Sequence, residues 1–364
     1  ELLREDFKFM ERALELAKRR KGLTHPNPTV GCVIVKDGKI VGEGYHEKAG
    51  MPHAEVVALQ KAGERAKGAT LYVTLEPCTH FGRTPPCTDA IIRAGLKRVV
   101  IASLDPNPLV SGKGVERLKK AGIEVSVGVL EEEARRLNED FFIYISQKRP
   151  YITLKWAQSI DGSMATKSSD SKWISGEESR YFAHQLRSEA TAILVGINTA
   201  LRDDPELTIR AFSWERQPMR IVLDPQLRIR EDLRIVKDGK APTLIITSSE
   251  NKEKIKRLED MGLKVIIAPT LEGKLNLGEV LRELYFMEIM HILVEGGSIT
   301  HTTFIKENLF DRLWVFLAPM LIGEGKRIGD IGVDSLLKAK RLRLRQIKRF
   351  GEDIALEYFP VIFS

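Results

Sequence analysis

The chain has 364 residues, of which 43% are hydrophobic and 29% charged, and this is typical of a globular protein long enough for two domains with full cores. Its formal net charge of +7 is small against 57 basic and 50 acidic residues, so it mildly favours anionic ligands such as phosphate and says little about nucleic acid. There is no run of about 18 apolar residues to suggest a membrane span, and the first residues lack a secretory signal pattern, so we expect a cytoplasmic protein.

The first half of the chain alternates helices and strands. Apolar residues at helical spacing predict a helix over residues 3–21, which Gly22 ends. A polar turn follows, and then two strands joined by Asp37-Gly38, a typical hairpin turn. The expected elements after the first helix are strands at 29–36 and 39–45, a helix at 53–62, a strand at 70–75, a helix from Cys87, a strand at 98–102 and a further segment at 115–121. This alternation predicts an α/β sandwich.

The residue set of a zinc deaminase lies within this half. His53 and Glu55 form a His-x-Glu motif, and Cys78 and Cys87 follow later in the chain. We interpret His53, Cys78 and Cys87 as three zinc ligands, which leaves a fourth coordination position open for water. Zinc lowers the pKa of a water molecule in such a position. Glu55 is then the catalytic residue, which carries a proton from the water to the departing amine.

A closed structural zinc site is the alternative, and it needs a fourth protein ligand. Cys32 is the remaining cysteine, but it lies in the apolar run at 30–35 and is predicted to be a small core residue. His80 suits either a fourth ligand or a substrate contact. Asn27, between two prolines, suits either turn formation or recognition of a base. We favour the catalytic site. With two of three cysteines assigned to metal, no pair remains for a disulfide, which fits a reducing compartment.

A polar break at residues 147–150 separates the two halves, and we place the domains at 1–147 and 148–364. The second half is predicted to form strands at 151–157, 192–195, 219–223, 244–247, 265–267 and 292–294, and helices at 177–188, 252–261, 277–286 and 299–307. This order predicts a parallel sheet with helices on both faces. No Gly-x-Gly-x-x-Gly fingerprint follows the first strand. Gly296-Gly297, at a late strand end, suits either a dinucleotide phosphate or a tight turn.

The spacing of the cysteines distinguishes this chain from common base deaminases. Eight residues separate Cys78 from Cys87, within the pattern Pro-Cys-x-His-x-Gly-x-x-Pro-Pro-Cys. With this pattern, the first half resembles the deaminase domain of the bifunctional deaminase/reductase family of riboflavin biosynthesis. The second half resembles the reductase domain of the same family, through Lys155-x3-Ser159-x-Asp161-Gly162 and Glu295-Gly296-Gly297. The resemblance implies a cytidine-deaminase-like α/β/α domain, followed by a dihydrofolate-reductase-like α/β domain that uses NADPH.

The resemblance also implies site residues in both domains. In the deaminase domain the implied substrate contacts are Asn27, His46, His80, Arg83, Asp105 and Asn107. In the reductase domain the implied NADPH contacts are Ala157, Trp173, Thr199, Asp203 and Gly297. The implied substrate contacts there are Ser171, Arg187, Leu207, Arg210 and Glu295. The arginines are suited to a ribose phosphate, and Glu295 to a hydroxyl group or a ring nitrogen. Lys155 and Asp161 are candidate helpers of hydride transfer.

We therefore predict a two-step enzyme that depends on Zn²⁺ and NADPH. The first step deaminates 2,5-diamino-6-ribosylamino-4(3H)-pyrimidinone 5′-phosphate, and the second reduces its ribosyl group to ribityl. The expected partner is this small molecule, with neither nucleic acid nor membrane, and a homo-oligomer is compatible with the sequence. Two alternatives stay open: deamination of a base in RNA or of a free nucleoside, and a non-catalytic protein that zinc stabilises.

Overall fold

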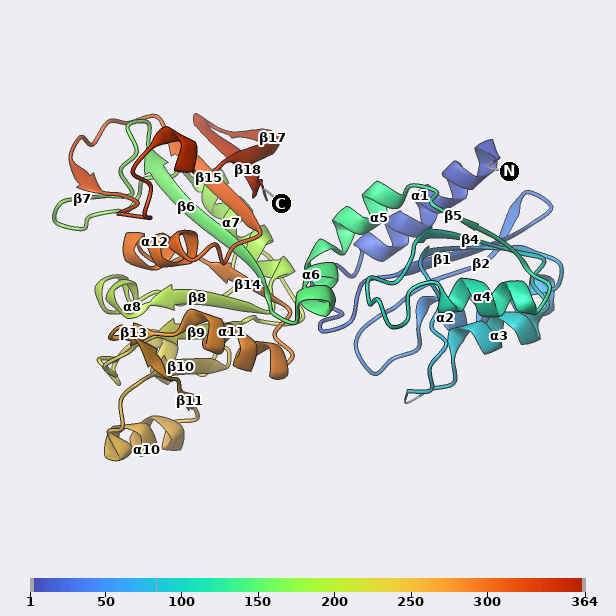
Figure 1. Ribbon diagram of the computed structural model, residues 1–364, viewed down its shortest axis with the longest axis horizontal. Helices are drawn as coiled ribbons and strands as arrows, with labels where there is room; N and C mark the ends of the chain where they lie inside the picture. Colours follow the sequence, from blue (N-terminus) through green and yellow to red (C-terminus); the bar gives the residue numbers. More distant parts are fainter. Residues whose placement is uncertain (1–2, 83, 362–364) are drawn as a thin grey trace. The chain divides into compact units, whose positions relative to one another are not determined.

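The computed structural model describes residues 3–82 and 84–361. The chain divides into two compact units, Glu1–Arg149 and Pro150–Ser364. Within the described ranges, no helix combines the length and the apolar character needed to cross a membrane. Each unit has its own sheet (Figure 1).

The first unit is built on a mixed sheet. Over the described part of this unit, five strands lie in the order β2-β1-β3-β4-β5, with β1 antiparallel to both of its neighbours and β3, β4 and β5 parallel. The strands are β1 (Gly31–Lys36), β2 (Lys39–Tyr45), β3 (Thr70–Leu75), β4 (Arg98–Ser103) and β5 (Glu124–Val127). The helices are α1 (Arg4–Lys18), α2 (Ala54–Ala62), α3 (Cys87–Ala94), α4 (Lys113–Lys120), α5 (Glu131–Leu137) and α6 (Glu139–Gln147), with a 3₁₀ turn, η1 (Gly63–Ala66).

Helices cover both faces of this sheet. Helices α2, α3 and α4 lie on one face, and α1 and α5 lie on the other (Figure 1). The central strands β3 and β4 are buried on both sides, which explains their continuous apolar sequences. Helix α2 lies very close to β2, since a Cβ atom at Gly42 would come within 2.4 Å of the Ala58 carbonyl oxygen. The close approach of α2 fixes the position of the His-x-Glu motif at its start.

The second unit contains a larger sheet. Among its described residues, nine strands lie in the order β11-β10-β9-β8-β14-β6-β15-β18-β17. They are β6 (Tyr151–Ser159), β8 (Ala192–Gly196), β9 (Met219–Leu223), β10 (Thr243–Thr247), β11 (Lys264–Ile267), β14 (His291–Val294), β15 (Arg312–Ala318), β17 (Leu342–Phe350) and β18 (Asp353–Pro360). Two short ribbons pair β7 (Ala165–Thr166) with β16 (Gly325–Lys326) and β12 (Thr270–Leu271) with β13 (Lys274–Leu275).

Helices also lie on both faces of the large sheet. Helices α7 (Glu177–Glu189), α8 (Ile197–Asp203) and α10 (Lys252–Asp260) pack on one face. Helices α11 (Leu277–Phe286) and α12 (Ser298–Lys306) pack on the other. The short helices α9 (Arg234–Lys237) and η2 (Leu336–Lys338) lie in connections. The strands from β11 to β15 are parallel, so the carboxyl ends of β6, β8 and β14 meet at one edge of the sheet.

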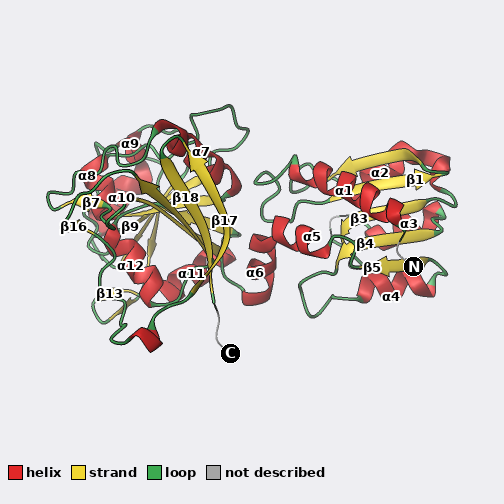
Figure 2. Ribbon diagram, turned by 90° about the horizontal axis from the view of Figure 1, so that it is seen from above, coloured by secondary structure: helices red, strands yellow, loops and turns green. Residues whose placement is uncertain are grey.

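The predicted fold class is confirmed, with differences in detail. The expected first helix, at 3–21, ends at Lys18. After β5, two helices, α5 and α6, follow each other directly. The expected parallel sheet ends in an antiparallel hairpin, because β17 and β18 follow each other through a tight turn at Gly351 and pair side by side (Figure 2).

Candidate active sites

Three metal-binding side chains meet at one end of the first sheet. His53 immediately precedes α2, Cys78 follows β3, and Cys87 begins α3. The Nδ1 atom of His53 lies 3.1 Å from the Cys87 sulfur and 3.8 Å from the Cys78 sulfur. Tetrahedral zinc with ordinary bond lengths places a nitrogen and a sulfur ligand about 3.6 Å apart. The described residues offer this one group of three donor atoms within 4.8 Å of one another, and its size and chemistry fit zinc.

The loop between the two cysteines is closed by contacts at its ends. The Cys87 N–H donates to the Cys78 sulfur at 3.3 Å. The N–H and the hydroxyl of Thr88 both donate to the Cys78 carbonyl, at 3.2 and 3.1 Å. Hydrogen bonding with the Cys87 thiol lowers the pKa of Cys78, against the effect of burial, whereas the same contact raises the pKa of Cys87. Cys78 is thus prepared to act as a thiolate ligand.

Glu55 lies in the first turn of α2, two residues beyond His53, and only 4% of it is exposed. Burial raises the pKa of its carboxyl group, which favours a residue that takes up a proton. Cys32 is fully buried in β1 and stands outside the donor group, as its apolar surroundings predicted. His80 is exposed on the loop after Cys78, and the donor group in the described residues does not include it.

A hydrogen-bonded chain joins Asn27 to the residue before the histidine ligand. The Asn27 side-chain nitrogen lies 3.1 Å from Nε2 of His46, and Nδ1 of His46 lies 3.1 Å from the Pro52 carbonyl. Since a carbonyl only accepts, Nδ1 of His46 carries the hydrogen and Nε2 accepts from Asn27. The rings of His46 and His53 are 5.5 Å apart. Two of the residues implied as substrate contacts therefore lie beside the donor group.

Glu76 is a site residue to which the sequence interpretation gave no role. Its carboxylate accepts hydrogen bonds from the backbone N–H groups of Asp105, Gly112 and Val115, at 3.0, 3.0 and 3.1 Å. The loop that follows β4 is therefore tied to the end of β3, next to Cys78. Its position directly before Pro77-Cys78 is the sequence signal that would have found it.

The loop held by Glu76 carries Asp105 and Asn107. The Asp105 carboxylate accepts from the Asn107 N–H at 2.8 Å, and the Asn107 side-chain oxygen accepts from the Leu109 N–H at 3.1 Å. Burial raises the pKa of Asp105, while the charge of His80 acts in the opposite direction. Asp105 therefore lies within electrostatic range of His80. Arg83, implied as a phosphate contact, lies outside the described residues.

A second polar cluster lies at the carboxyl end of β14. Glu295 follows this strand, and both of its oxygens accept from Arg187 of α7, at 3.1 and 2.7 Å. Arg187 also donates to the Thr208 carbonyl at 2.8 Å, which accepts from Arg210 as well, at 3.3 Å. Burial would raise the pKa of Glu295, but the charges of Arg187 and Lys155 lower it. Two guanidinium groups thus meet at one carbonyl oxygen, and only one of them has a carboxylate among the hydrogen bonds of the described residues.

The two candidate helpers of hydride transfer differ in their surroundings. Lys155 lies on β6, and burial lowers the pKa of its ammonium group, an effect that the charge of Glu295 opposes. The carboxylate of Asp161 accepts from the Ser159 hydroxyl at 2.6 Å and from the N–H groups of Ile322 and Gly323. These hydrogen bonds, led by that of Ser159, lower the pKa of Asp161 to about 2.

The residues implied as NADPH contacts are distributed around this edge of the sheet. A Cβ atom at Gly297 would lie 2.8 Å from the Thr199 hydroxyl oxygen, so the turn after β14 touches the start of α8. The Lys172 ammonium donates to the Asp203 carbonyl at 3.4 Å. Trp173 is 66% exposed, and the Arg180 guanidinium lies over its ring. Ala157 lies on β6, two residues beyond Lys155.

Ser171 and Leu207, both implied as substrate contacts, lie in different surroundings. Ser171 is partly buried, two residues before Trp173, in the segment that Lys172 connects to α8. The side chain of Leu207 is 3% exposed and packs into the core beneath α8, and its backbone has a positive φ of 54°. A substrate contact from Leu207 would therefore come from its main chain.

His184 also belongs to this cluster, although the sequence interpretation did not identify it. Its Nδ1 atom accepts from the N–H groups of Arg210 and Ala211, at 3.0 and 3.4 Å. Burial and the charge of Arg187 lower the pKa of His184 to about 4, so its ring is neutral and can accept at neutral pH. A lone histidine on a helix carries no local signal for such a role.

The chain matches known families in both units. A family model of the cytidine and deoxycytidylate deaminase zinc-binding region matches residues 3–103. A model of the RibD C-terminal domain matches residues 150–356. The riboflavin biosynthesis protein RibD of Aquifex aeolicus (strain VF5) is 60% identical over 351 residues, which are 96% of this chain and 97% of that protein. The protein of the same name from Escherichia coli (strain K12) is 42% identical over 366 residues, 97% of this chain and 98% of the relative.

Solved structures show the same similarity over the full length. RibD of Acinetobacter baumannii, form 1, has a TM-score of 0.89 at 39% identity and covers 99% of this chain and 100% of its own. A diaminohydroxyphosphoribosylaminopyrimidine deaminase/5-amino-6-(5-phosphoribosylamino)uracil reductase from Thermotoga maritima has a TM-score of 0.86 at 37% identity. It covers 98% of this chain and 99% of its own.

Proposed function

Because this chain belongs to the RibD family of riboflavin biosynthesis proteins, we propose that its two units act in succession on one pyrimidine that carries a ribose phosphate. The chain is a bifunctional enzyme with a zinc-dependent deaminase and an NADPH-dependent reductase. The proposed first substrate is diaminohydroxyphosphoribosylaminopyrimidine, and the second is 5-amino-6-(5-phosphoribosylamino)uracil. The observation that carries the proposal is the group formed by His53, Cys78 and Cys87 beside the buried Glu55.

In the deaminase unit, His53, Cys78 and Cys87 hold zinc, which supplies Lewis acidity and an acidified water molecule when bound. Glu55 takes a proton from the attacking water and returns it to the amino group, which leaves as ammonia. Its buried position supports this role, because burial raises its affinity for a proton. Asn27 and His46 contact the ring, since their hydrogen-bonded chain places them beside His53.

The loop residues complete the proposed substrate site of the deaminase unit. Asp105 and Asn107 hold polar groups of the substrate, because Glu76 fixes their loop next to Cys78. His80 and Arg83 are the other implied contacts with the substrate, and an arginine suits its phosphate. The hydrogen bonds that the Cys87 N–H and the Thr88 hydroxyl donate to Cys78 hold the two cysteines together.

In the reductase unit, Ala157, Trp173, Thr199, Asp203 and Gly297 would hold NADPH. When bound, this cofactor would supply a hydride for the ribosyl C1′ in its open imine form. Arg210, with Arg187 beside it, binds the phosphate of the substrate, because the hydrogen bonds of the described residues provide its guanidinium with no carboxylate. Glu295, oriented by Arg187, accepts from a hydroxyl group, and Ser171 and the main chain of Leu207 complete the site.

The proton that the imine nitrogen needs comes from Lys155 in this proposal. Burial lowers the pKa of Lys155, which makes its proton easier to release, and the charge of Glu295 opposes this effect. Asp161 is less suitable, because its carboxylate is occupied by hydrogen bonds from Ser159, Ile322 and Gly323, and its lowered pKa leaves no proton to donate.

The proposed setting of the reactions follows from the same residues. We infer a cytoplasmic enzyme, because free cysteines such as Cys78 and Cys87 fit a reducing compartment. Its partners are then small molecules and no nucleic acid, and a homo-oligomer is compatible with the exposed β17–β18 hairpin.

The test is a mass-spectrometric assay of the diaminopyrimidine ribose phosphate, with zinc-loaded enzyme, in the absence and presence of NADPH. We expect loss of ammonia in both reactions and the gain of two hydrogens only with NADPH. Glu55→Gln should lower the rate of deamination by about 100-fold or more, and it should leave the rate of reduction of the deaminated compound unchanged. Glu64→Gln, an exposed glutamate beyond α2, is the matched control. A Glu55→Gln enzyme that still releases ammonia at the normal rate would refute the assignment.

A further inference from the structure

The carboxylate of Glu206 lies close to Arg210, the proposed phosphate ligand of the reductase unit. The Thr208 hydroxyl connects the two side chains: it donates to Oε1 of Glu206 at 2.8 Å and accepts from Arg210 at 3.3 Å. Glu206 is largely buried, with 10% of its side chain exposed. An anion so near to Arg210 is a competitor for the phosphate that we assign to this arginine.

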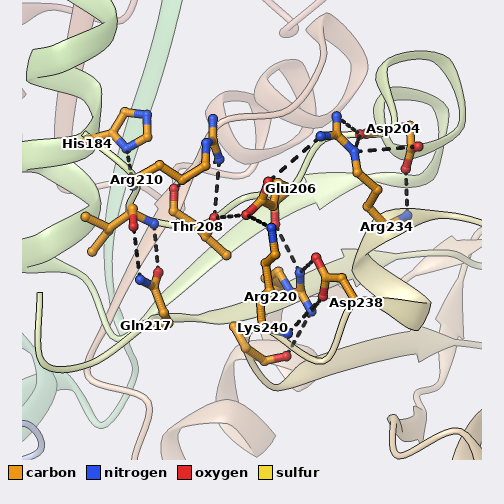
Figure 3. Close-up of polar contacts among 12 residues, drawn as sticks. His184, Asp204, Glu206, Thr208, Arg210, Gln217, Arg220, Arg234, Asp238 and Lys240 are labelled. Carbon is orange, nitrogen blue, oxygen red and sulfur yellow. Dashed lines mark hydrogen bonds and ion pairs between the residues drawn. The ribbon is translucent and has the colours of Figure 1, made fainter. Parts of the chain in front are cut away.

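A lysine from a distant part of the chain holds Glu206 in its present position. The Lys240 ammonium donates to Oε1 of Glu206 at 2.9 Å (Figure 3). Arg234 approaches the other oxygen at 3.8 Å, but its Nε and Nη2 atoms donate to the Asp204 carbonyl. Lys240 is therefore the closest cation bound to this carboxylate, and it also lowers the pKa of Glu206.

The backbone on both sides of this contact is anchored. The buried Arg220 donates to the Glu206 carbonyl at 3.1 Å and forms two hydrogen bonds with Asp238, at 3.0 and 2.8 Å (Figure 3). The Lys240 N–H donates to the same Asp238 carboxylate at 3.0 Å. Arg220 and Asp238 thus hold residues 206 and 240 next to each other, so the ion pair between their side chains requires little ordering of the chain.

We propose that Lys240 is a positioning residue, which keeps the carboxylate of Glu206 away from Arg210 so that Arg210 can bind the phosphate of the substrate. This inference rests on the proposed function of Arg210. Without Lys240, the largely buried carboxylate of Glu206 has Arg210 and Arg234 as nearby cations. Arg210 is open to it, because the hydrogen bonds of the described residues give Arg210 no carboxylate partner. Glu206 then turns toward Arg210 and competes with the substrate. The presence of Arg234 keeps the effect moderate.

The experiment is a double-mutant cycle of Lys240→Gln and Glu206→Gln in the full-length enzyme. The readouts are the KM for 5-amino-6-(5-phosphoribosylamino)uracil, the kcat, and the inhibition constant of inorganic phosphate. Lys240→Gln should raise the KM and the inhibition constant about fivefold with little change in kcat. In the Glu206→Gln background the same change at Lys240 should have no effect, because the competing carboxylate is gone. An equal rise of KM in both backgrounds, or no rise in either, would overturn the proposal.

Two further variants separate this proposal from the assignment of Arg210. Lys338→Gln removes another exposed lysine paired with an acidic residue, Asp334 at 3.1 Å, and it should leave the KM unchanged. Arg210→Gln should raise the KM and the inhibition constant of phosphate by more than Lys240→Gln does. If Arg210→Gln leaves both constants unchanged, the assignment of Arg210 fails. If Arg210→Gln raises them and Lys240→Gln does not, only the role of Lys240 fails.

Discussion

Glu76→Gln should impair the deaminase far more than the reductase. The Glu76 carboxylate accepts three backbone N–H groups, from Asp105, Gly112 and Val115. Glutamine keeps one oxygen, which can still accept two of them, but its amide nitrogen must then face the third donor. Losing one hydrogen bond to a charged group and weakening two others costs about 2 kcal/mol, which lowers the ratio of ordered to disordered loop about 30-fold. Asp105 and Asn107 lie on this loop, so the kcat/KM of deamination should fall by up to this factor.

The assay compares both activities of the same preparation. Ammonia release reports the deaminase, and NADPH consumption with the deaminated compound reports the reductase as an internal control. Glu116→Gln is the matched variant, because Glu116 follows Val115 directly but its partner Lys120 is a surface residue. The reasoning would be refuted if deamination stayed at the normal rate, or if both activities fell equally in proportion to a lower melting temperature.

Two further predictions concern the pH dependence of stability. Burial would raise the pKa of Asp6, but hydrogen bonds from Arg98, Leu3 and Tyr72 lower it. The charged Asp6 therefore stabilises the first unit above its unfolded pKa of about 3.9, and this stability is lost as the pH falls through its pKa in the folded protein. Asp6→Asn, which leaves Arg98 buried, should lower the free energy of unfolding by about 3 kcal/mol at pH 7 and reduce the loss of stability below about pH 4. Urea unfolding from pH 3 to 7 measures both effects. An unchanged dependence of the free energy of unfolding on pH in the acid range would contradict the argument. Burial lowers the pKa of His184 to about 4, below its unfolded value of about 6.5, so the unfolded chain binds more protons in this window and the second unit loses stability as the pH falls through it. His184→Gln should reduce that slope in urea unfolding at pH 7, 6 and 5, and a slope equal to that of the unchanged protein would be the contrary result.

Local patterns in the sequence predicted many of the strands and helices and the group of metal donors. Continuous apolar runs predicted β3 and β4 because both faces of these strands are buried. The His-x-Glu motif at a helix start and Cys78 at a strand end predicted donors that the structure brings together. Each of these signals lies within a few residues of the feature that it predicts.

The contacts that position the substrate residues left no such signal. Glu206 and Lys240 are 34 residues apart, and each is one charged residue among many in the sequence. The role of His184 depends on backbone N–H groups 26 and 27 residues further on. Leu207 was implied as a substrate contact, but its side chain packs into the core, which no local pattern in the sequence indicated. Such contacts depend on how the chain folds and leave no pattern in the sequence near each residue.

The closure between Cys78 and Cys87 has a consequence for enzyme engineering. The Cys87 N–H and both donors of Thr88 hold the second cysteine against the first, so the metal donors stay in place independently of the eight residues between them. Residues 79–86 form an insertion whose two ends are joined at the site, and lengthening such a loop costs little entropy. Libraries that vary the length and composition of this segment can therefore explore new amine substrates while the zinc chemistry is retained.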